Sequence, residues 1–222
     1  DHGKREVGMR FDLTVPFARF AAQHISTLGT PFKRYHMGTV WRGENTQRGR
    51  YREFMQCDFD TIGTTSAISD LETVLVVHDL LAAIGIDKFT IRINDRRILS
   101  GILEVLGLTS KTTHVLRCLD KTGKIPRDTL AKELQEQGVS VPSIDRLLGL
   151  GELAGSATDV LNELQDLVGE SVIGTQGVEA VCALLSGLSE VGVRDDRITL
   201  DPSIARGLDY YTGIVLESFL DE

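Results

Sequence analysis

The sequence predicts an α+β fold, in which an antiparallel sheet is flanked by helices and interrupted by a helical insertion. Segments with a strand pattern occupy the first part of the 222 residues and return near the end. Between them, apolar residues recur at the spacing of helices, and glycines separate the runs. The composition, with 41% hydrophobic and 25% charged residues, is typical of a folded domain.

Extended segments dominate the N-terminal part. Residues 9–15 alternate between apolar and polar side chains, which predicts a strand that Pro16 ends, and residues 17–25 predict a short helix. Residues 32–41 form a second extended run and residues 50–62 a third. The last two runs flank an arginine-rich loop, so they predict a strand–loop–strand hairpin.

A helix and a strand follow the hairpin. Ser69 and Glu72 fit the S-x-x-E capping box at the start of a helix, and Gly85 fits the glycine that ends one. Residues 89–94, F-T-I-R-I-N, have the composition of a strand. Asp95 directly after this strand predicts the N-terminal cap of the next helix.

Helices separated by glycines then replace the strands. The expected helices are residues 96–106, 127–137, 143–149, 157–167 and 176–191, and their apolar residues are expected to form core. Extended structure returns at residues 197–200 and 213–219. We therefore predict a strand-rich core, residues 1–95 and 194–222, and a helical insertion or connection, residues 96–193.

Cysteine, histidine and hydropathy patterns exclude several classes of protein. Cys57, Cys118 and Cys182 are widely spaced without a C-x-x-C pair, and the five histidines lack metal-ligand spacing. We therefore expect no disulfide framework, no protein-built metal site and a reducing, cytoplasmic location. No apolar run reaches the length of a membrane span and no signal peptide opens the chain, so no membrane partner is expected. The first residue is Asp1, which predicts a segment of a longer protein.

The chain carries a net charge of −8, but its arginine-rich loop is strongly basic. Residues 33–52 contain six basic side chains and one acidic side chain, Glu44. Arginine forks bind phosphate oxygens in pairs, so arginines at both stems of the hairpin predict a polyphosphate site. A solvated basic loop explains the same charges equally well, and charge alone leaves both interpretations open. The pattern G-x-x-x-x-G-K-[ST] is absent, which excludes a P-loop.

The third extended run has one chemically mixed face. Alternation places one set of side chains on this face, namely Arg50, Arg52, Phe54, Gln56, Asp58 and Asp60. The other face is more apolar and carries Tyr51, Glu53, Met55, Cys57 and Phe59. A solvated face of an antiparallel sheet explains polar residues. An aromatic ring and an amide among the charges favour the alternative, a ligand floor to which Asp12 and Thr14 of the first segment contribute.

Three separated motifs resemble a known family. W-R-G-E at residues 41–44 and R-Y-R-E-F at 50–54 resemble motif 2 of the class II aminoacyl-tRNA synthetases. Within that class, F-D-L-T at 11–14, G-R-Y-R-E-F-M-Q-C-D-F-D at 49–60 and A-R-G-L-D-Y-Y-T-G at 205–213 are similar to histidyl-tRNA synthetases. The resemblance spans nearly the whole chain and is weakest in its helical middle. It implies a class II synthetase-like sheet and an enzyme, a histidine–tRNA ligase that forms histidyl-adenylate and transfers histidine to tRNA.

The resemblance assigns the ATP contacts to the hairpin. It implies that Arg42 contacts the α-phosphate and the histidine carboxylate, and that Glu44 holds the adenine side. Arg50 would reach the distal phosphates and Phe54 would stack on the adenine ring. Arg42 and Arg206 would be the catalytic residues, because fixed positive charge stabilises the negative charge that develops at the α-phosphate. Mg²⁺ would be held chiefly by phosphates, without a protein metal motif.

The resemblance also assigns contacts with histidine. The implied histidine-binding residues are Asp12, Leu13, Thr14, Arg42, Gln56, Asp60, Arg206, Tyr210 and Tyr211. Among them, Asp12, Thr14 and Gln56 would bind the α-amino group. Asp60 and Tyr211 would bind the two imidazole nitrogens, which a carboxylate and a phenol can serve in either donor–acceptor arrangement. Asp209 has no assigned role.

The implied partners are histidine, ATP and tRNA(His), and the implied assembly is a homodimer of the full-length protein. Motif 1, motif 3 and the anticodon-binding domain of the family are absent, which predicts weak or no activity of the segment alone. Two other interpretations stay open: a regulatory paralogue that senses histidine in histidine biosynthesis, and a degenerate tRNA-binding module. Arg42, Arg50, Phe54, Gln56 and Arg206 together favour the enzyme, because a sensor has no need to bind ATP.

Overall fold

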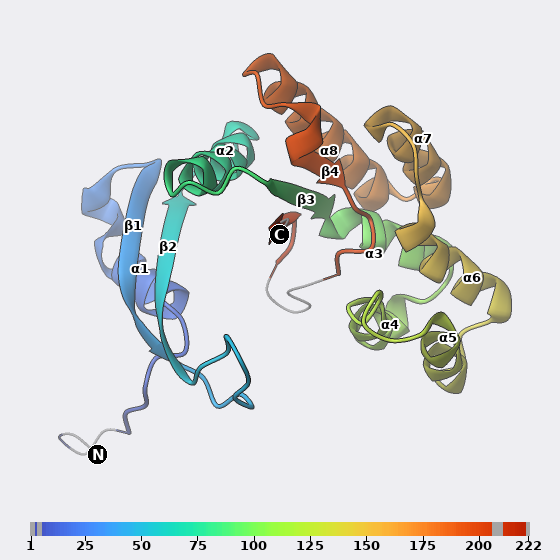
Figure 1. Cartoon of the computed structure of the whole chain (residues 1–222), viewed down its shortest axis with the longest axis horizontal. Helices are drawn as coiled ribbons and strands as arrows, with labels where there is room; N and C mark the ends of the chain where they lie inside the picture. The colour runs from blue at the N-terminus through green and yellow to red at the C-terminus, as the bar shows by residue number, and fades with distance from the viewer. Residues whose placement is uncertain (1–2, 4–5, 206–210, 221–222) are drawn as a thin grey trace. The chain divides into compact units, whose positions relative to one another are not determined.

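The computed structural model of the chain describes residues 3, 6–205 and 211–220 (Figure 1). The architecture is α+β, as the sequence predicts, with two small sheets and several helices. The chain folds as two compact units, Asp1–Ser69 and Asp70–Glu222. The division into a strand-rich core and a helical insertion over residues 96–193 stays a prediction.

The first unit is built on an antiparallel β-hairpin. β1 (Phe32–Trp41) and β2 (Glu53–Ile62) pair from Phe32 opposite Ile62 to Trp41 opposite Glu53. Both predicted runs are confirmed, although β2 starts at Glu53 and not at Arg50. The later start has a local cause, because Gln47 and Arg50 exchange backbone hydrogen bonds across a turn. Gly49 in this turn has a φ of 77°, a conformation that glycine adopts without strain.

The predicted strand over residues 9–15 is wrong. α1 (Thr14–Leu28) already begins at Thr14, and Pro16 lies in its first turn, where a missing backbone N–H is tolerated. The Asp12 carboxylate accepts a hydrogen bond from the Val15 N–H at 3.0 Å, which favours the start of the helix at this point. The short alternating pattern of residues 9–15 therefore leads into a helix and does not form a strand.

A three-stranded sheet forms part of the second unit. β3 (Phe89–Asp95) lies between β4 (Ile198–Leu200) and β5 (Ile214–Leu220). β5 runs antiparallel to β3, but β4 runs parallel to it, which differs from the expected antiparallel sheet. A parallel neighbour requires a crossover between the two strands, and the helices between residues 96 and 197 provide it.

The helix before β3 is confirmed, but its cap is not. α2 (Ile68–Ala83) starts one residue before Ser69, so this serine lies inside the first turn. The Ser69 hydroxyl donates a hydrogen bond to the carbonyl oxygen of Ser66 at 2.7 Å. Gly85 follows the helix with a φ of 83°, as expected of a glycine that ends a helix.

The helical part of the second unit largely follows the predicted pattern. Its α-helices are α3 (Arg96–Val105), α4 (Thr112–Leu119), α5 (Arg127–Glu136), α6 (Val141–Gly149), α7 (Ala157–Val168) and α8 (Val172–Glu190). Asp95 caps α3 as predicted, because its carboxylate accepts a hydrogen bond from the Arg97 N–H at 2.8 Å. The sequence did not predict α4, a short helix that starts without a side-chain cap.

The core of the second unit forms between β3 and the helices. Phe89, Ile91 and Ile93 of β3 are buried in one cluster with Ile98 and Ile102 of α3, and buried residues of α4 to α8 extend it. The expectation that apolar residues at helical spacing form core is confirmed for these helices. α8 alone among the described helices has the length and hydropathy of a candidate membrane span. Its buried face packs in this cluster, which is the usual place of an apolar helix in a folded core.

Glycines allow α3 and α8 to cross closely. A Cβ atom added to Gly101 would lie 2.4 Å from the Gly174 Cα, and one added to Gly177 would lie 2.8 Å from the Ile98 backbone nitrogen. Both distances are too short for real atoms, and the obstacle in each case is backbone that cannot rotate away. The close crossing of α3 and α8 therefore requires residues without a side chain at these positions.

We expect Gly101→Ala to lower the free energy of unfolding by about 1–3 kcal/mol, the usual effect of overpacking a tight core. Urea titration followed by circular dichroism measures the change. Gly149→Ala is the matched control, because its added Cβ meets open space at the end of α6. Equal stability of the two variants would contradict the importance of the glycine contact.

Candidate active site

A small cavity lies at the loop end of the β1–β2 hairpin. It has a volume of about 210 Å³ and is lined by Arg42, Glu44, Gly49, Arg50, Tyr51 and Phe54. The four residues predicted to contact ATP are all in this lining. The cavity combines two guanidinium groups with an aromatic ring, a set that suits a ligand with a planar ring and anionic oxygens.

Arg42 is held at this cavity by its neighbours. Its Nε donates a hydrogen bond to the Phe11 carbonyl oxygen at 3.0 Å, and its Cζ lies 5.1 Å from the centroid of the Phe54 ring. The two Nη atoms make no hydrogen bond or ion pair to the described residues. The fork of the guanidinium is therefore oriented by the chain and available to a ligand.

An ion pair and a hydrogen bond connect residues of the loop between the strands. Arg50 Nε lies 2.7 Å from Glu44 Oε2, and Arg52 Nε donates a hydrogen bond to the Glu44 carbonyl oxygen at 3.1 Å. The Arg50 and Glu44 side chains are 60% and 38% exposed, so their ion pair contributes little to stability. Displacement of Glu44 from Arg50 by an anion therefore costs little free energy.

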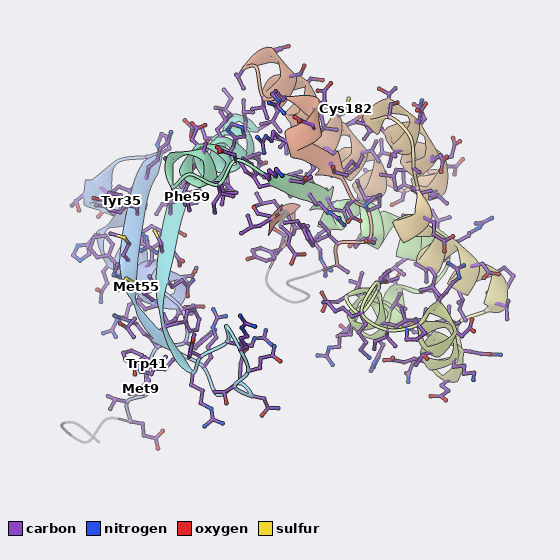
Figure 2. All side chains as sticks on the ribbon, in the orientation of Figure 1. Met9, Tyr35, Trp41, Met55, Phe59 and Cys182 are labelled. Atoms are coloured by element: carbon purple, nitrogen blue, oxygen red, sulfur yellow. The ribbon has the colours of Figure 1, made fainter. Side chains whose placement is uncertain are left out.

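The mixed face predicted for the third run is confirmed from Phe54 onward, and it is the more buried face of the hairpin. Phe54, Gln56, Asp58 and Asp60 are partly buried there. The opposite, apolar face is open in this chain: the exposed fractions are 77% for Tyr35 and 71% for Met55. Four residues of that face, Tyr35, Trp41, Met55 and Phe59, are labelled in Figure 2. The polar face is thus not a solvated one, contrary to the simpler of the two interpretations.

The segment before α1 covers the polar face. Leu13 is fully buried, and a Cβ atom added to Gly38 of β1 would lie 3.4 Å from the Leu13 Cδ2. The segment therefore packs directly on the strand at Gly38. The Trp41 N–H donates to the Arg10 carbonyl oxygen at 2.9 Å, which ties the segment to the end of β1. Asp12 and Thr14 are thereby held beside the hairpin.

Gln56 presents an unused acceptor on this face. Its Nε2 donates a hydrogen bond to Asp58 Oδ1 at 2.6 Å, which orients the amide. Its Oε1 is buried and has no hydrogen-bond partner among the described residues. A buried carbonyl oxygen without a donor is unfavourable in the free protein. It is the arrangement expected of a group that binds an ammonium or another N–H donor.

Asp60 is paired with a residue that the sequence did not single out. Arg34 of β1 lies opposite Asp60 in the register, and its Nη2 is 2.7 Å from Asp60 Oδ2. Burial raises the pKa of the Asp60 carboxyl, while the positive charge of Arg34 opposes this shift. Arg34 was counted only among the basic residues of the loop, because the pairing depends on the hairpin register. The available signal in the sequence was the pair of opposite charges, Arg34 and Asp60, in the two runs predicted to form one hairpin.

The A-R-G-L-D-Y-Y-T-G motif belongs to the second unit, and its central residues, Arg206 to Tyr210, lie outside the described residues. Asn94 Nδ2 donates to the carbonyl oxygens of Pro202 and Ile204 at 3.1 and 3.0 Å, so the chain leading to the motif is fixed on β3. Tyr211 after the gap is 51% exposed. The predictions for Arg206, Asp209, Tyr210 and Tyr211 stay predictions.

Among the described residues, no cluster of three or more His, Cys, Asp or Glu side chains could hold a metal ion. The three cysteines are free thiols, and burial raises the pKa of the Cys118 thiol.

Comparison with known proteins gives consistent results. A sequence profile of the family described as histidyl-tRNA synthetase matches residues 1–222. A histidine–tRNA ligase of Rhodopirellula baltica is 58% identical over 223 residues, which are 100% of this chain and 50% of that protein. A histidine–tRNA ligase of Wolinella succinogenes is 46% identical over 100% of this chain and 51% of its own length. The chain thus spans about half the length of the curated relatives it matches.

Solved structures agree with the sequence comparison. The crystal structure of a histidyl-tRNA synthetase from a Nostoc species has a TM-score of 0.87 and is 33% identical, covering 95% of this chain and 49% of that one. A Bacillus halodurans structure described as an ATP phosphoribosyltransferase regulatory subunit/histidyl-tRNA synthetase has a TM-score of 0.81 at 21% identity, over 96% of this chain and 54% of that one. The second likeness shows the fold alone.

Proposed function

This chain belongs to the histidyl-tRNA synthetase family, and from that premise we propose that the protein containing it is a histidine–tRNA ligase. In this proposal the chain supplies the part of the catalytic domain that binds histidine and ATP. The observation that carries the proposal is the cavity at the hairpin, where Arg42, Glu44, Arg50 and Phe54 converge. The full-length protein would act as a cytoplasmic homodimer with tRNA(His) as its final acceptor.

The ATP end of the proposed site uses the ring and the two arginines of the cavity. Phe54 stacks on adenine with Glu44 on the adenine side, Arg50 binds the distal phosphates, and Arg42 binds the α-phosphate. Mg²⁺ usually binds through phosphates and one or two carboxylates. Glu44 is the one carboxylate among the six residues that line the cavity, so the phosphates would supply most of the ligands. When bound, the ion neutralises phosphate charge.

The histidine end of the proposed site lies on the polar face of the hairpin. Asp12, Thr14 and the unpaired oxygen of Gln56 bind the α-amino group, with Leu13 as the buried support of this segment. Asp60 binds one imidazole nitrogen, and Tyr211 binds the other, with Tyr210 beside it. A site with a partner for each ring nitrogen rejects amino acids that leave these partners unpaired.

The proposed chemistry needs position and charge more than proton transfer. The histidine carboxylate attacks the α-phosphorus of ATP, a bond forms to that phosphorus, and pyrophosphate leaves. The nucleophile is already ionised, so no general base is required. Negative charge increases on the α-phosphate oxygens, and Arg42 together with Arg206 stabilises it in the transition state. The histidyl-adenylate then transfers its acyl group to the terminal ribose of the tRNA.

Histidine-dependent exchange of pyrophosphate into ATP tests the proposal in the full-length protein. We expect exchange that requires histidine and is not supported by other amino acids. Folded protein without exchange above background would overturn the ligase and favour a histidine-sensing paralogue or a tRNA-binding module. Binding of histidine without exchange would single out the sensor.

Phe54→Ala is expected to raise the KM for ATP about tenfold, because stacking of a base on an aromatic ring contributes about 1–3 kcal/mol. The KM for histidine should change little, and initial rates of exchange at varied ATP and histidine measure both. Met55→Ala is the matched control, since Met55 is the next residue on β2 but lies on the exposed face. An unchanged KM for ATP in Phe54→Ala would contradict the stacking role.

A further inference from the structure

The guanidinium of Arg34 connects two parts of the first unit that are far apart in sequence. Its Nη2 donates a hydrogen bond to the Leu13 carbonyl oxygen at 3.2 Å and lies 2.7 Å from Asp60 Oδ2. Its Cζ lies 4.0 Å from the centroid of the Phe17 ring in α1. One side chain of β1 thus contacts the segment before α1, the helix itself and the strand β2.

This arrangement is buried and shaped for an arginine. The Arg34 and Asp60 side chains are only 12% and 21% exposed, so the pair is largely removed from water. The guanidinium lies over the Phe17 ring while its Nη2 approaches both the Leu13 carbonyl oxygen and the Asp60 carboxylate, a combination that the point charge of lysine matches poorly. Breaking a buried pair leaves an uncompensated charge, so the two side chains hold each other in place.

We propose that Arg34 is a positioning residue for the binding of histidine, because it fixes Asp60 relative to the segment that contains Asp12 and Thr14. The inference rests on the proposed function, in which Asp60 binds imidazole and the segment binds the α-amino group. The two recognition groups sit on separate elements, and a site that recognises both ends of one ligand depends on the distance between them. Arg34 contacts both elements directly.

The charged groups around Asp60 also affect how its protonation depends on pH. Arg34, Asp58 and His36 are the charged or titratable groups that act on the Asp60 carboxyl. Burial already favours its protonated form, and Arg34 opposes this. Asp60 accepts an imidazole N–H more strongly when it is ionised, so loss of Arg34 would move the acidic limb of the pH profile for kcat/KM with histidine to higher pH.

The test is made on the full-length protein with the pyrophosphate-exchange assay. Arg34→Met keeps the length of the side chain and removes its charge and donors. We expect the KM for histidine to rise about 10- to 100-fold, the effect of misplaced binding groups, while the KM for ATP stays unchanged. A purely structural defect would instead lower the active fraction, and so kcat, without separating the two KM values or shifting the pH profile.

Arg34→Lys keeps the charge and separates the two effects. In this variant the acidic limb should stay at the wild-type pH, while the KM for histidine should still rise, because the shorter lysine side chain has no planar guanidinium to lie over Phe17 while its charged end reaches Leu13 and Asp60. If Arg34→Met does not fold, the KM for histidine of Arg34→Lys alone tests the proposal. Lys33→Met is the matched control, since Lys33 is the preceding residue of β1 and its side chain is exposed on the other face.

Four outcomes are decisive. A raised KM for histidine in both Arg34 variants, with wild-type values in Lys33→Met, supports the inference. A wild-type KM for histidine in Arg34→Lys, or an equal rise of both KM values in Arg34→Met, overturns it. A wild-type protein without histidine-dependent exchange would instead overturn the proposed function on which it rests.

Discussion

Arg42→Ala is expected to lower the rate of histidyl-adenylate formation by about 10²–10³-fold, or about 2.7–4 kcal/mol of transition-state stabilisation. The structure motivates this size of effect, because Arg42 is oriented by Phe11 and Phe54 and offers its fork to the cavity. A group that is held in place before the reaction loses no free energy in becoming ordered during it. Single-turnover formation of the adenylate, measured in the full-length protein, reports the chemical step directly.

The control for Arg42 is another arginine of the same loop. Arg48 is exposed and lies outside the residues that line the cavity, so Arg48→Ala should leave the rate nearly unchanged. The pair separates a specific contact from the general positive charge of the loop. Equal losses in the two variants would mean that net charge, and not the position of Arg42, supports the reaction.

Arg206→Ala is expected to have an effect of similar size, about 10²–10³-fold on adenylate formation, while histidine binding survives in part. The side chain would stabilise charge at the α-phosphate, which develops in the transition state more than in the ground state. Adenylate formation and the equilibrium binding of histidine therefore have to be measured separately. The design tests a role that the family resemblance assigns to a residue outside the described part of the chain.

An exposed arginine elsewhere in the second unit provides the control for Arg206. Arg194 is paired with Asp196 at the surface, and Arg194→Ala should retain the wild-type rate. If Arg206→Ala turned over normally, the assigned role would be wrong. If it lost histidine binding completely, Arg206 would be a binding residue for histidine and not chiefly a stabiliser of the transition state.

Local patterns predicted many of the elements well. The run that became β1 was predicted with its observed bounds, and α3 was predicted from its spacing together with its cap, Asp95. Both depend on interactions among neighbours in the sequence. The segment at residues 9–15 failed because its alternation was too short to distinguish a strand from the approach to a helix, and Pro16 is compatible with either.

The site divides in the same way. Arg42, Glu44, Arg50 and Phe54 lie in and beside the loop of one hairpin, so a motif with short spacing could name them, and the structure brings them to one cavity. Arg34 could not be named in this way. Its partners are Leu13 and Asp60, which lie on two other segments, and their meeting depends on the register of β1 and β2 and on the path of the segment before α1.

The sequence by itself determined the family, the α+β class and the chemical groups of the hairpin cavity, because motifs and periodicity are properties of near neighbours along the chain. Only the tertiary structure decided that the polar face of the hairpin is the covered one. It also showed that Gln56 keeps an unpaired buried oxygen and that Arg34 holds Asp60. Burial and cross-strand pairing arise when distant segments pack together, and they decide which polar groups stay available to a ligand.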